Sequence, residues 1–261
     1  KLPPFLPMHD LSERLRAHSI SAADTARHLL GRVQELDRQG PELRAVIEIN
    51  PDAMALATAL DQAGEGRGPL HGCPIFIKDN IDSADALHTT AGSLALMDSR
   101  PRKDAFIVSR LRAAGMLILG KTNLSEWANI RSPHSTSGWS ARGGLTKHPY
   151  RLDHNPSGSS SGSAVAVAAG LTPAAIGTET NGSIVSPSSV CGIVGLKPTR
   201  GLVSRSGIIP ISLWQDSAGP MARTVRDAAL LLNVIAGTDP ADEATAAAAG
   251  HLDDFTSCLR D

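Results

Sequence analysis

Residues 155–169 read Asn-Pro-Ser-Gly-Ser-Ser-Ser-Gly-Ser-Ala-Val-Ala-Val-Ala-Ala. The first nine residues are small and polar and the last six are apolar, which predicts a loop that leads into a buried helix ending at Gly170. Residues 173–176 then predict a short strand, and residues 177–183 predict a second polar loop that contains glycine. Because ligands bind at the carboxyl ends of strands in open α/β sheets, we expect a functional site around this loop.

Helices with recognisable first residues lie on both sides of this stretch. Ser21 and Asp24 form a capping-box pattern before an apolar periodicity that Gly40 ends. Asp104 is predicted to cap a second helix that ends at Gly115. Thr224, with an aspartate three residues later, starts a last helix with an apolar stripe.

Apolar runs at residues 43–49, 73–78 and 116–119 predict strands of a sheet that is buried on both faces. Strands that alternate with helices are typical of an α/β protein. We therefore predict a mixed, largely buried central sheet that is covered by helices on both faces. Residues 1–261 are expected to form a single domain.

The composition narrows the range of partners. The chain has 261 residues, of which 41% are hydrophobic, and 25 Lys and Arg residues balance 26 Asp and Glu residues to a formal charge of −1. This balance argues against nucleic acid or an anionic membrane surface as the main partner and favours a small molecule. Three widely spaced cysteines and nine histidines without metal-ligand spacing indicate neither a disulfide scaffold nor a metal site.

No apolar stretch reaches the length needed to span a membrane. The chain opens on Lys1 without a charged and then apolar leader, so we expect that an export signal is either removed or was never there. Both a cytoplasmic and an exported location stay open, and so does the oligomeric state.

Two short motifs suggest other functions. Residues 115–122, Gly-Met-Leu-Ile-Leu-Gly-Lys-Thr, match the phosphate-binding loop of nucleotide-binding proteins, but four bulky apolar residues between the glycines favour a buried strand. Residues 158–162 match the nucleophile elbow of α/β-hydrolases, with Ser160 as the nucleophile of an esterase. That elbow needs an apolar strand before it, and residues 148–156 contain two prolines and almost no apolar run.

Only six lysines occur, and Lys78, Lys121 and Lys197 each lie beside an apolar run. Burial lowers the pKa of a lysine, and a neutral amine can act as a base. The pattern alone does not choose between this role and a lysine whose charged end reaches solvent, nor does it single out one of the three lysines.

Three blocks together resemble the amidase signature family. They are His71-Gly-Cys-Pro-Ile-Phe-Ile-Lys-Asp-Asn80, Gly158-Ser-Ser-Ser-Gly-Ser163 and Gly177-Thr-Glu-Thr-Asn-Gly-Ser-Ile184. Residues 120–128, 195–199 and 201–210 are similar to the peptide-amidase branch of that family. Many family members have an arginine two residues after the nucleophile, and this chain has Val185 there, as the peptide-amidase branch does.

The resemblance implies a catalytic set of Ser183 as nucleophile, Ser159 held through a cis peptide, and Lys78 as base. It also implies that the backbone N–H groups of Thr180, Asn181, Gly182 and Ser183 bind the oxyanion, and that Ala128 borders the acyl site. The implied reaction converts a carboxamide to an acid and ammonia through an acyl-enzyme, and the substrate is expected to be the C-terminal amide of a peptide. Neither a cofactor nor a metal is implied.

Members of the resembled family run substantially further than this chain. We therefore expect residues 1–261 to be the N-terminal portion of an amidase signature domain whose C-terminal remainder is absent. A role as a non-enzymatic interaction subunit stays open at this point, as does whether such a chain is active.

Overall fold

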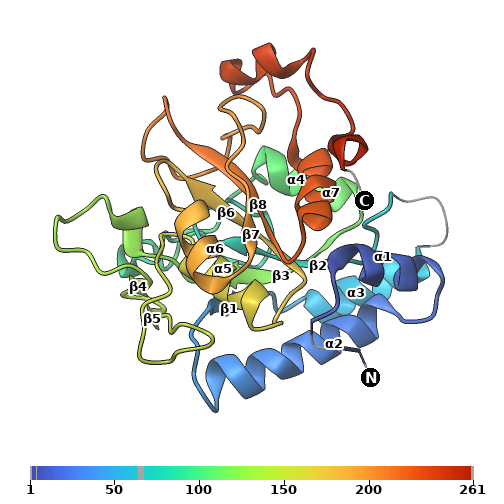
Figure 1. The fold of residues 1–261 in the computed structure, drawn as a ribbon, viewed down its shortest axis with the longest axis horizontal. Coiled ribbons are helices and arrows are strands. Elements are labelled where there is room, and N and C mark those ends of the chain that lie inside the picture. The colour runs from blue at the N-terminus through green and yellow to red at the C-terminus, as the bar shows by residue number, and fades with distance from the viewer. Residues whose placement is uncertain (1, 4, 64–67, 260–261) are drawn as a thin grey trace.

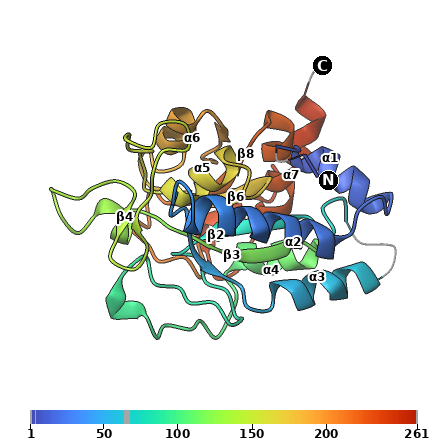
Figure 2. The same ribbon diagram turned by 90° about the horizontal axis from the view of Figure 1, so that it is seen from below.

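The computed structural model describes residues 2, 3, 5–63 and 68–259, and its centre is a six-stranded mixed sheet (Figure 1). In spatial order the strands are β1 (Val46–Ile49), β3 (Leu117–Thr122), β2 (Pro74–Lys78), β6 (Ala174–Glu179), β8 (Ser217–Ala222) and β7 (Val194–Gly195). The three central strands β3, β2 and β6 are parallel, and the outer strands pair antiparallel with their neighbours. A separate hairpin, β4 (Trp139–Ser140) and β5 (Gly144–Leu145), lies at the opposite end of the molecule from helix α1 (Met8–Arg16) (Figure 2).

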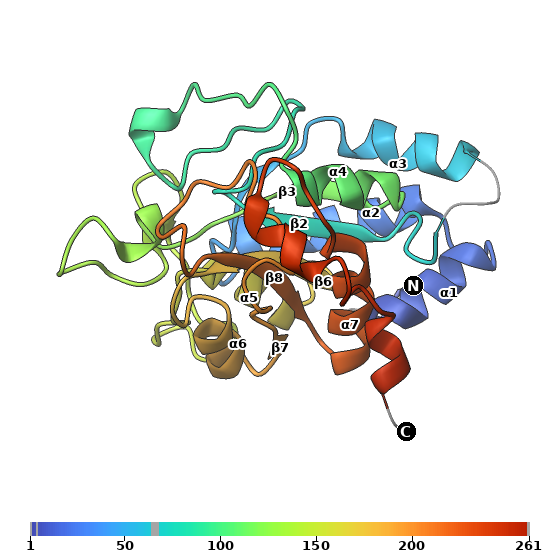
Figure 3. The same ribbon diagram turned by 90° about the horizontal axis from the view of Figure 1, so that it is seen from above.

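Helices cover both faces of the sheet. The α-helices are α1 (Met8–Arg16), α2 (Ala22–Arg32), α3 (Ala53–Gln62), α4 (Phe106–Ala113), α5 (Ser161–Ala168), α6 (Val185–Cys191) and α7 (Val225–Ile235). Helices α5 and α6 lie on one side of β2 and β3, and α3 and α4 lie on the other (Figure 3). Short π or 3-10 turns span Val33–Arg38, Leu94–Leu96, Glu126–Asn129, Glu243–Ala248 and Phe255–Cys258. Within the described ranges, every helix is too short or too polar to cross a membrane.

The central strands are buried along their whole length. Every residue of β2, β3 and β6 is buried, including the large side chains of Ile75, Phe76 and Ile77. Apolar strands without an alternating polar face are typical of a sheet covered on both sides. The prediction of a mixed, largely buried α/β sheet is confirmed.

The small, polar residues 155–163 lead into a buried helix, as predicted. All eight residues of α5 are buried, and the left-handed backbone at Gly170 follows its end. At Gly162 a Cβ atom would lie 2.2 Å from the carbonyl oxygen of Ala45, so only glycine lets α5 approach the sheet this closely.

The helix starts predicted at Ser21 and Thr224 are confirmed, because each side chain accepts the backbone N–H three residues on, from Asp24 and Asp227. The cap predicted at Asp104 is wrong. Helix α4 begins after Ala105 without a side-chain cap, and the Asp104 carboxylate instead accepts the Ala84 N–H and pairs with Arg112. The carboxylate is engaged by an ion pair from within the helix, which a local capping rule does not anticipate.

Candidate active site

Strands β2 and β6 bring a lysine and a polar loop to the same edge of the sheet. Both strands run in the same direction, with Phe76 opposite Ala175 and Ile77 opposite Ile176. Their carboxyl ends therefore meet, and Lys78 lies beside Thr178. Residues 177–179, predicted as the start of a loop, extend the strand instead, because they pair with β8 along their length.

The Lys78 amine is fully buried and held by three oxygen atoms. Its Nζ lies 2.8 Å from Ser159 Oγ, 2.9 Å from Thr178 Oγ1 and 3.3 Å from the Thr178 carbonyl oxygen. Burial lowers the pKa of Lys78 to about 7, and the negative charges of Asp216 and Glu179 oppose this shift. A substantial fraction of this amine is therefore neutral at physiological pH.

Ser159 and Ser183 reach the site from different loops. The Gly158–Ser159 peptide bond is cis, and the Ser159 carbonyl accepts the Ser125 N–H at 3.0 Å. The Ser183 carbonyl accepts the Ser160 N–H at 3.0 Å, which ties the two serine loops together. Among the described residues no hydrogen bond joins the Ser159 and Ser183 hydroxyls, but both side chains line the same cleft.

This cleft is lined by a group of polar side chains and by an apolar wall. Asn80, Ser159, Thr178 and Ser183 are on the polar side. The apolar wall consists of Ile208, Ile209, Pro210, Ile211 and Leu213. Other polar or charged residues that line the cleft are Glu179, Thr180, Arg205, Asp216 and Ser217. A cleft that combines an apolar wall with converging polar groups is typical of a small-molecule or peptide site.

Two carboxylates fix the walls of the cleft. Asp216 accepts a hydrogen bond from the Thr180 hydroxyl and two from the backbone N–H groups of Ile211 and Ser212, at 2.7 and 2.9 Å. Glu179 is buried and accepts the N–H groups of Gly182, Ile184 and Val185 at 2.7 to 2.9 Å. Glu179 therefore holds the loop that carries Ser183.

In the loop that carries Ser183, fewer backbone N–H groups are free to bind an oxyanion than the family resemblance implies. Gly182, in a left-handed conformation with φ of 83° that favours glycine, already donates its N–H to Glu179. Within the described residues the N–H groups of Thr180, Asn181 and Ser183 donate to no protein acceptor. Of the predicted donors, Gly182 is therefore engaged elsewhere, and the other three stay candidates.

Ala128 does not line the cleft. Trp127, Ala128 and Asn129 all have left-handed backbone conformations, and the Ala128 N–H donates to the Ser125 carbonyl at 2.8 Å. Because the Ser125 N–H in turn donates to Ser159, the Ala128 turn is linked to the site through the backbone. A direct role at the acyl site stays a prediction.

Replacing Glu179 with glutamine is expected to loosen the Ser183 loop. The amide has one acceptor oxygen and two donor hydrogens, so at least one of the three loop N–H groups loses its acceptor, at about 1–3 kcal/mol of unfolding free energy. We expect kcat/KM to fall at least about tenfold. Loss of the negative charge is also expected to lower the pKa of Lys78, because Glu179 raises that pKa.

Thermal unfolding and kcat/KM against pH measure these effects, with the exposed Glu13→Gln on α1 as the matched control. A Glu179→Gln variant with the stability and rate of the control would contradict the role of the carboxylate.

The structure rejects Ser160 as an esterase nucleophile. Ser160 is fully buried, and its hydroxyl donates to the Thr178 carbonyl at 3.0 Å and accepts the Thr178 N–H at 3.2 Å. The residue does not line the cleft, and the described residues 146–159 directly before it contain no strand. The hydroxyl connects α5 to β6 and has a structural role.

The nucleotide-binding motif is also not a phosphate loop. Its last six residues form the buried strand β3, so their backbone N–H groups do not converge on a ligand.

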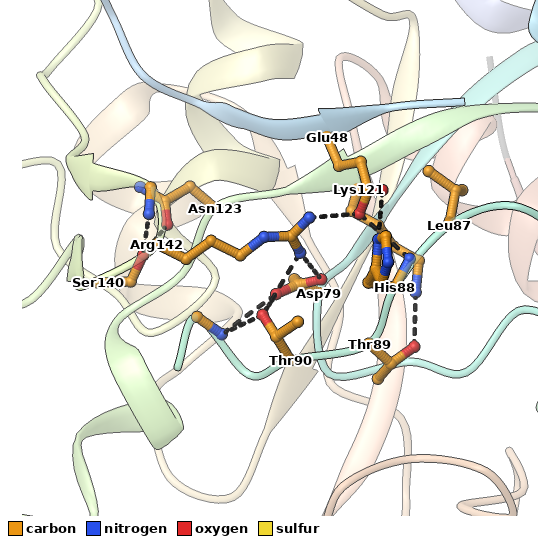
Figure 4. Close-up of polar contacts among 12 residues, drawn as sticks. Glu48, Asp79, Leu87, His88, Thr89, Thr90, Lys121, Asn123, Ser140 and Arg142 are labelled. Carbon is orange, nitrogen blue, oxygen red and sulfur yellow. Dashed lines mark hydrogen bonds and ion pairs between the residues drawn. The ribbon is translucent and has the colours of Figure 1, made fainter. Parts of the chain in front are cut away.

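Lys121, in β3, is a second fully buried lysine, but it faces away from the cleft. In the parallel register Lys121 lies opposite Ile77, whereas Thr122 lies opposite Lys78. The two amines therefore point to opposite faces of the sheet. Lys121 Nζ donates to the Ile81 carbonyl at 2.5 Å. It also donates to Thr89 Oγ1 at 2.9 Å (Figure 4).

Acidic side chains surround Lys121. Burial lowers its pKa to about 8, and Asp79 is the largest of the charges that oppose this shift. Asp79 also lies 3.3 Å from Arg142, which pairs with Glu48 at 2.6 Å (Figure 4). Among the described residues no serine hydrogen-bonds to the Lys121 amine, which distinguishes this network from the Lys78 site. Lys197, the third lysine considered, is only partly buried and does not line the cleft.

Sequence reasoning missed four residues of the site. Thr178, Glu179 and Asn80 belong to the quoted blocks, but no role was assigned to them, and Asp216 lies outside those blocks. Polar residues at the end of a buried strand were the signal available for Thr178 and Glu179. Asp216 is recognisable only when the fold brings it to Thr180.

Residues 26–257 match the family model described as Amidase, so the chain belongs to the amidase family. The six-stranded mixed sheet agrees with solved structures of that family.

Within the family the chain is similar to the native peptide amidase from Stenotrophomonas maltophilia, with 58% identity and a TM-score of 0.93 over 96% of this chain and 52% of that one. The resemblance to the peptide-amidase branch is thereby confirmed. An amidase family protein from Bacillus anthracis is 42% identical, with a TM-score of 0.94 over 98% of this chain and 51% of that one. A probable amidase of Arabidopsis thaliana is 51% identical over 84% of this chain and 44% of its own length. The chain thus spans about half the length of these relatives.

Proposed function

We propose that this protein hydrolyses a carboxamide to a carboxylic acid and ammonia, with Ser183 as nucleophile, Ser159 as proton relay and Lys78 as base. The observation that carries this proposal is the 2.8 Å contact between the buried Lys78 amine and Ser159 Oγ, at a cleft lined by Ser159 and Ser183. A base next to a hydroxyl, with a second hydroxyl in the same cleft, provides a path for the proton of the nucleophile.

Each proton in this reaction passes through Ser159. Ser183 Oγ attacks the amide carbonyl carbon and gives its proton to Ser159 Oγ, which passes its own proton to neutral Lys78. The free N–H groups of Thr180, Asn181 and Ser183 are the candidates to stabilise the oxyanion. The lysine proton then returns by way of Ser159 to the departing nitrogen, the C–N bond breaks, and ammonia leaves. Water then attacks the acyl-enzyme and gives one proton to Lys78 by way of Ser159. The ester bond to Ser183 breaks, that proton returns to Ser183 Oγ, and the acid leaves.

The expected substrate is the C-terminal amide of a peptide. Two observations support this class: the identity to the peptide amidase of Stenotrophomonas maltophilia, and the apolar wall formed by residues 208–211 and Leu213. An apolar wall beside the nucleophile suits an uncharged peptide end carrying an apolar side chain.

Incubation with an N-acetylated dipeptide amide tests the function. Release of ammonia together with the free dipeptide acid is the expected result. In H₂¹⁸O the acid gains one ¹⁸O atom, because water resolves the acyl-enzyme. Folded protein that forms no acid from amides with either apolar or polar side chains would refute the proposal.

The reaction is expected to lose its base as the pH falls. Below a pKa of about 7 the Lys78 amine holds a proton and cannot accept another. The acid limb of kcat/KM reports the pKa of the base in the free enzyme. We therefore expect kcat/KM to rise with pH through about 7 and to fall about tenfold for each unit below it. A limb centred near pH 4 would point to a carboxylate base instead.

A further inference from the structure

Asn80 connects the lysine pocket to the apolar wall of the cleft. The residue is 4% exposed and lies two positions after Lys78. Its side-chain Nδ2 donates to Thr178 Oγ1 at 3.0 Å, and its backbone carbonyl accepts the Ile209 N–H at 2.9 Å. Asn80 Oδ1 is buried and has no hydrogen-bond partner in the part of the chain described. Neither the Lys78 amine nor either catalytic serine bonds directly to Asn80.

The Thr178 side chain decides where the lone pair of Lys78 points. A neutral amine has two N–H bonds and one lone pair, and three oxygen atoms surround this one. When both N–H bonds go to Thr178, to Oγ1 and to the carbonyl oxygen, the lone pair is left for Ser159. This arrangement requires the Thr178 hydroxyl to accept a hydrogen bond from the amine and not to donate one.

Asn80 favours that arrangement. The Asn80 amide fixes one direction around Thr178 Oγ1 and thereby restricts the rotation of the hydroxyl. A released hydroxyl would turn and donate its own proton to the lysine lone pair, which would then no longer face Ser159. The hydroxyl would compete directly with the proton relay.

We propose that Asn80 is a positioning residue for the lysine base: by holding Thr178 Oγ1, it keeps the lone pair of Lys78 directed at Ser159. The catalytic meaning of this assignment rests on the proposed function. Through its backbone carbonyl, which accepts the Ile209 N–H, Asn80 is also linked to the apolar wall of the cleft.

A double-mutant cycle between Asn80 and Thr178 tests this assignment. The readout is the titration midpoint of the Lys78 amine, measured by ¹³C and ¹⁵N NMR of the lysine side chains and assigned with Lys78→Met. Asn80→Ala is expected to lower the midpoint, because the released hydroxyl stabilises the neutral amine. Thr178→Val also lowers it, because the ammonium loses an acceptor.

The combined variant is expected to have the midpoint of Thr178→Val alone, because no hydroxyl is left to release. Asn80→Asp, of equal size, is expected to raise the midpoint, since a carboxylate accepts the Thr178 proton and adds a negative charge near the ammonium. If both substitutions of Asn80 only loosened the surrounding structure, they would not shift the Lys78 midpoint in opposite directions. Thr178→Ser keeps the hydroxyl and should stay close to the native midpoint.

Asn50→Asp is the matched control, because Asn50 is equally buried but lies beyond the edge strand β1. In this variant the titration midpoint of the Lys78 amine should equal the native one. The assignment would be overturned if Asn80→Ala had the native Lys78 midpoint, or if the two shifts added in the combined variant. If the alanine variant does not fold, the midpoint of Asn80→Asp decides the case. The NMR measurement does not depend on turnover, so it separates the two proposals. A protein without amidase activity would refute the proposed function, and a double-mutant cycle that is not additive in that protein would still support the positioning role.

Discussion

Replacing Ser183 with alanine is expected to reduce kcat for amide hydrolysis by roughly 10⁶-fold, as the removal of other serine nucleophiles does. The acyl-enzyme cannot form without this oxygen, and the remaining oxyanion donors and cleft stabilise only attack by water. The fold should tolerate the change, because the structural contacts at Ser183 are made by its backbone. Ammonia release under single-turnover conditions, with thermal unfolding measured alongside, provides the test.

Ser160→Ala is the matched control for this experiment. Its hydroxyl joins α5 to Thr178 and does not line the cleft, so we expect lower stability but a rate much closer to the native one. The reverse pattern, with activity lost in Ser160→Ala and kept in Ser183→Ala, would restore the hydrolase elbow and reject our assignment.

Lys78→Met is the second variant with a large expected effect. Methionine fills a similar volume without an amine, so both the proton acceptor and the later proton donor are lost. General base catalysis typically contributes about 10²–10⁴-fold, and we expect the acylation rate to fall by that factor. Because burial disfavours the charged amine, the substitution should leave the melting temperature unchanged or raise it.

Lys121→Met separates the loss of a base from the loss of a buried lysine. Lys121 is as buried as Lys78, but it donates to Thr89 and Ile81 on the opposite face of the sheet. We expect a lower melting temperature, because Asp79 loses a compensating charge, and an acylation rate per folded molecule near the native one. Equal rate losses in both variants would show that the role assigned to Lys78 is wrong.

Much of the fold could be predicted because its signals are local. The apolar run before Lys78 and the small apolar helix that follows Ser160 both indicate burial without knowledge of the partners. The predictions failed where residues outside the local sequence context provide the hydrogen-bond partners of a side chain. Asp104 has the sequence context of a cap, yet it pairs with Ala84 and Arg112.

In the candidate site, too, local signals could be predicted from the sequence, and contacts between distant residues could not. Burial and strand position marked Lys78, Lys121 and Lys197 as equal candidates, and only the family resemblance favoured Lys78. The parallel register distinguishes the two strand lysines, because it directs Lys78 toward Ser159 and Lys121 to the opposite face of the sheet, where Asp79 is the largest opposing charge. The use of Gly182 by Glu179 could not be predicted, because a donor's availability depends on the acceptor that the folded loop provides.

Trapping the nucleophile with a fluorophosphonate and mapping the adduct by peptide mass spectrometry tests the central claim most directly. The reaction should place one phosphonyl group on Ser183, with a labelling rate that rises with pH through about 7 as the Lys78 amine loses its proton. An adduct on Ser160 or Ser159, or labelling of folded protein that does not depend on Lys78, would contradict the account.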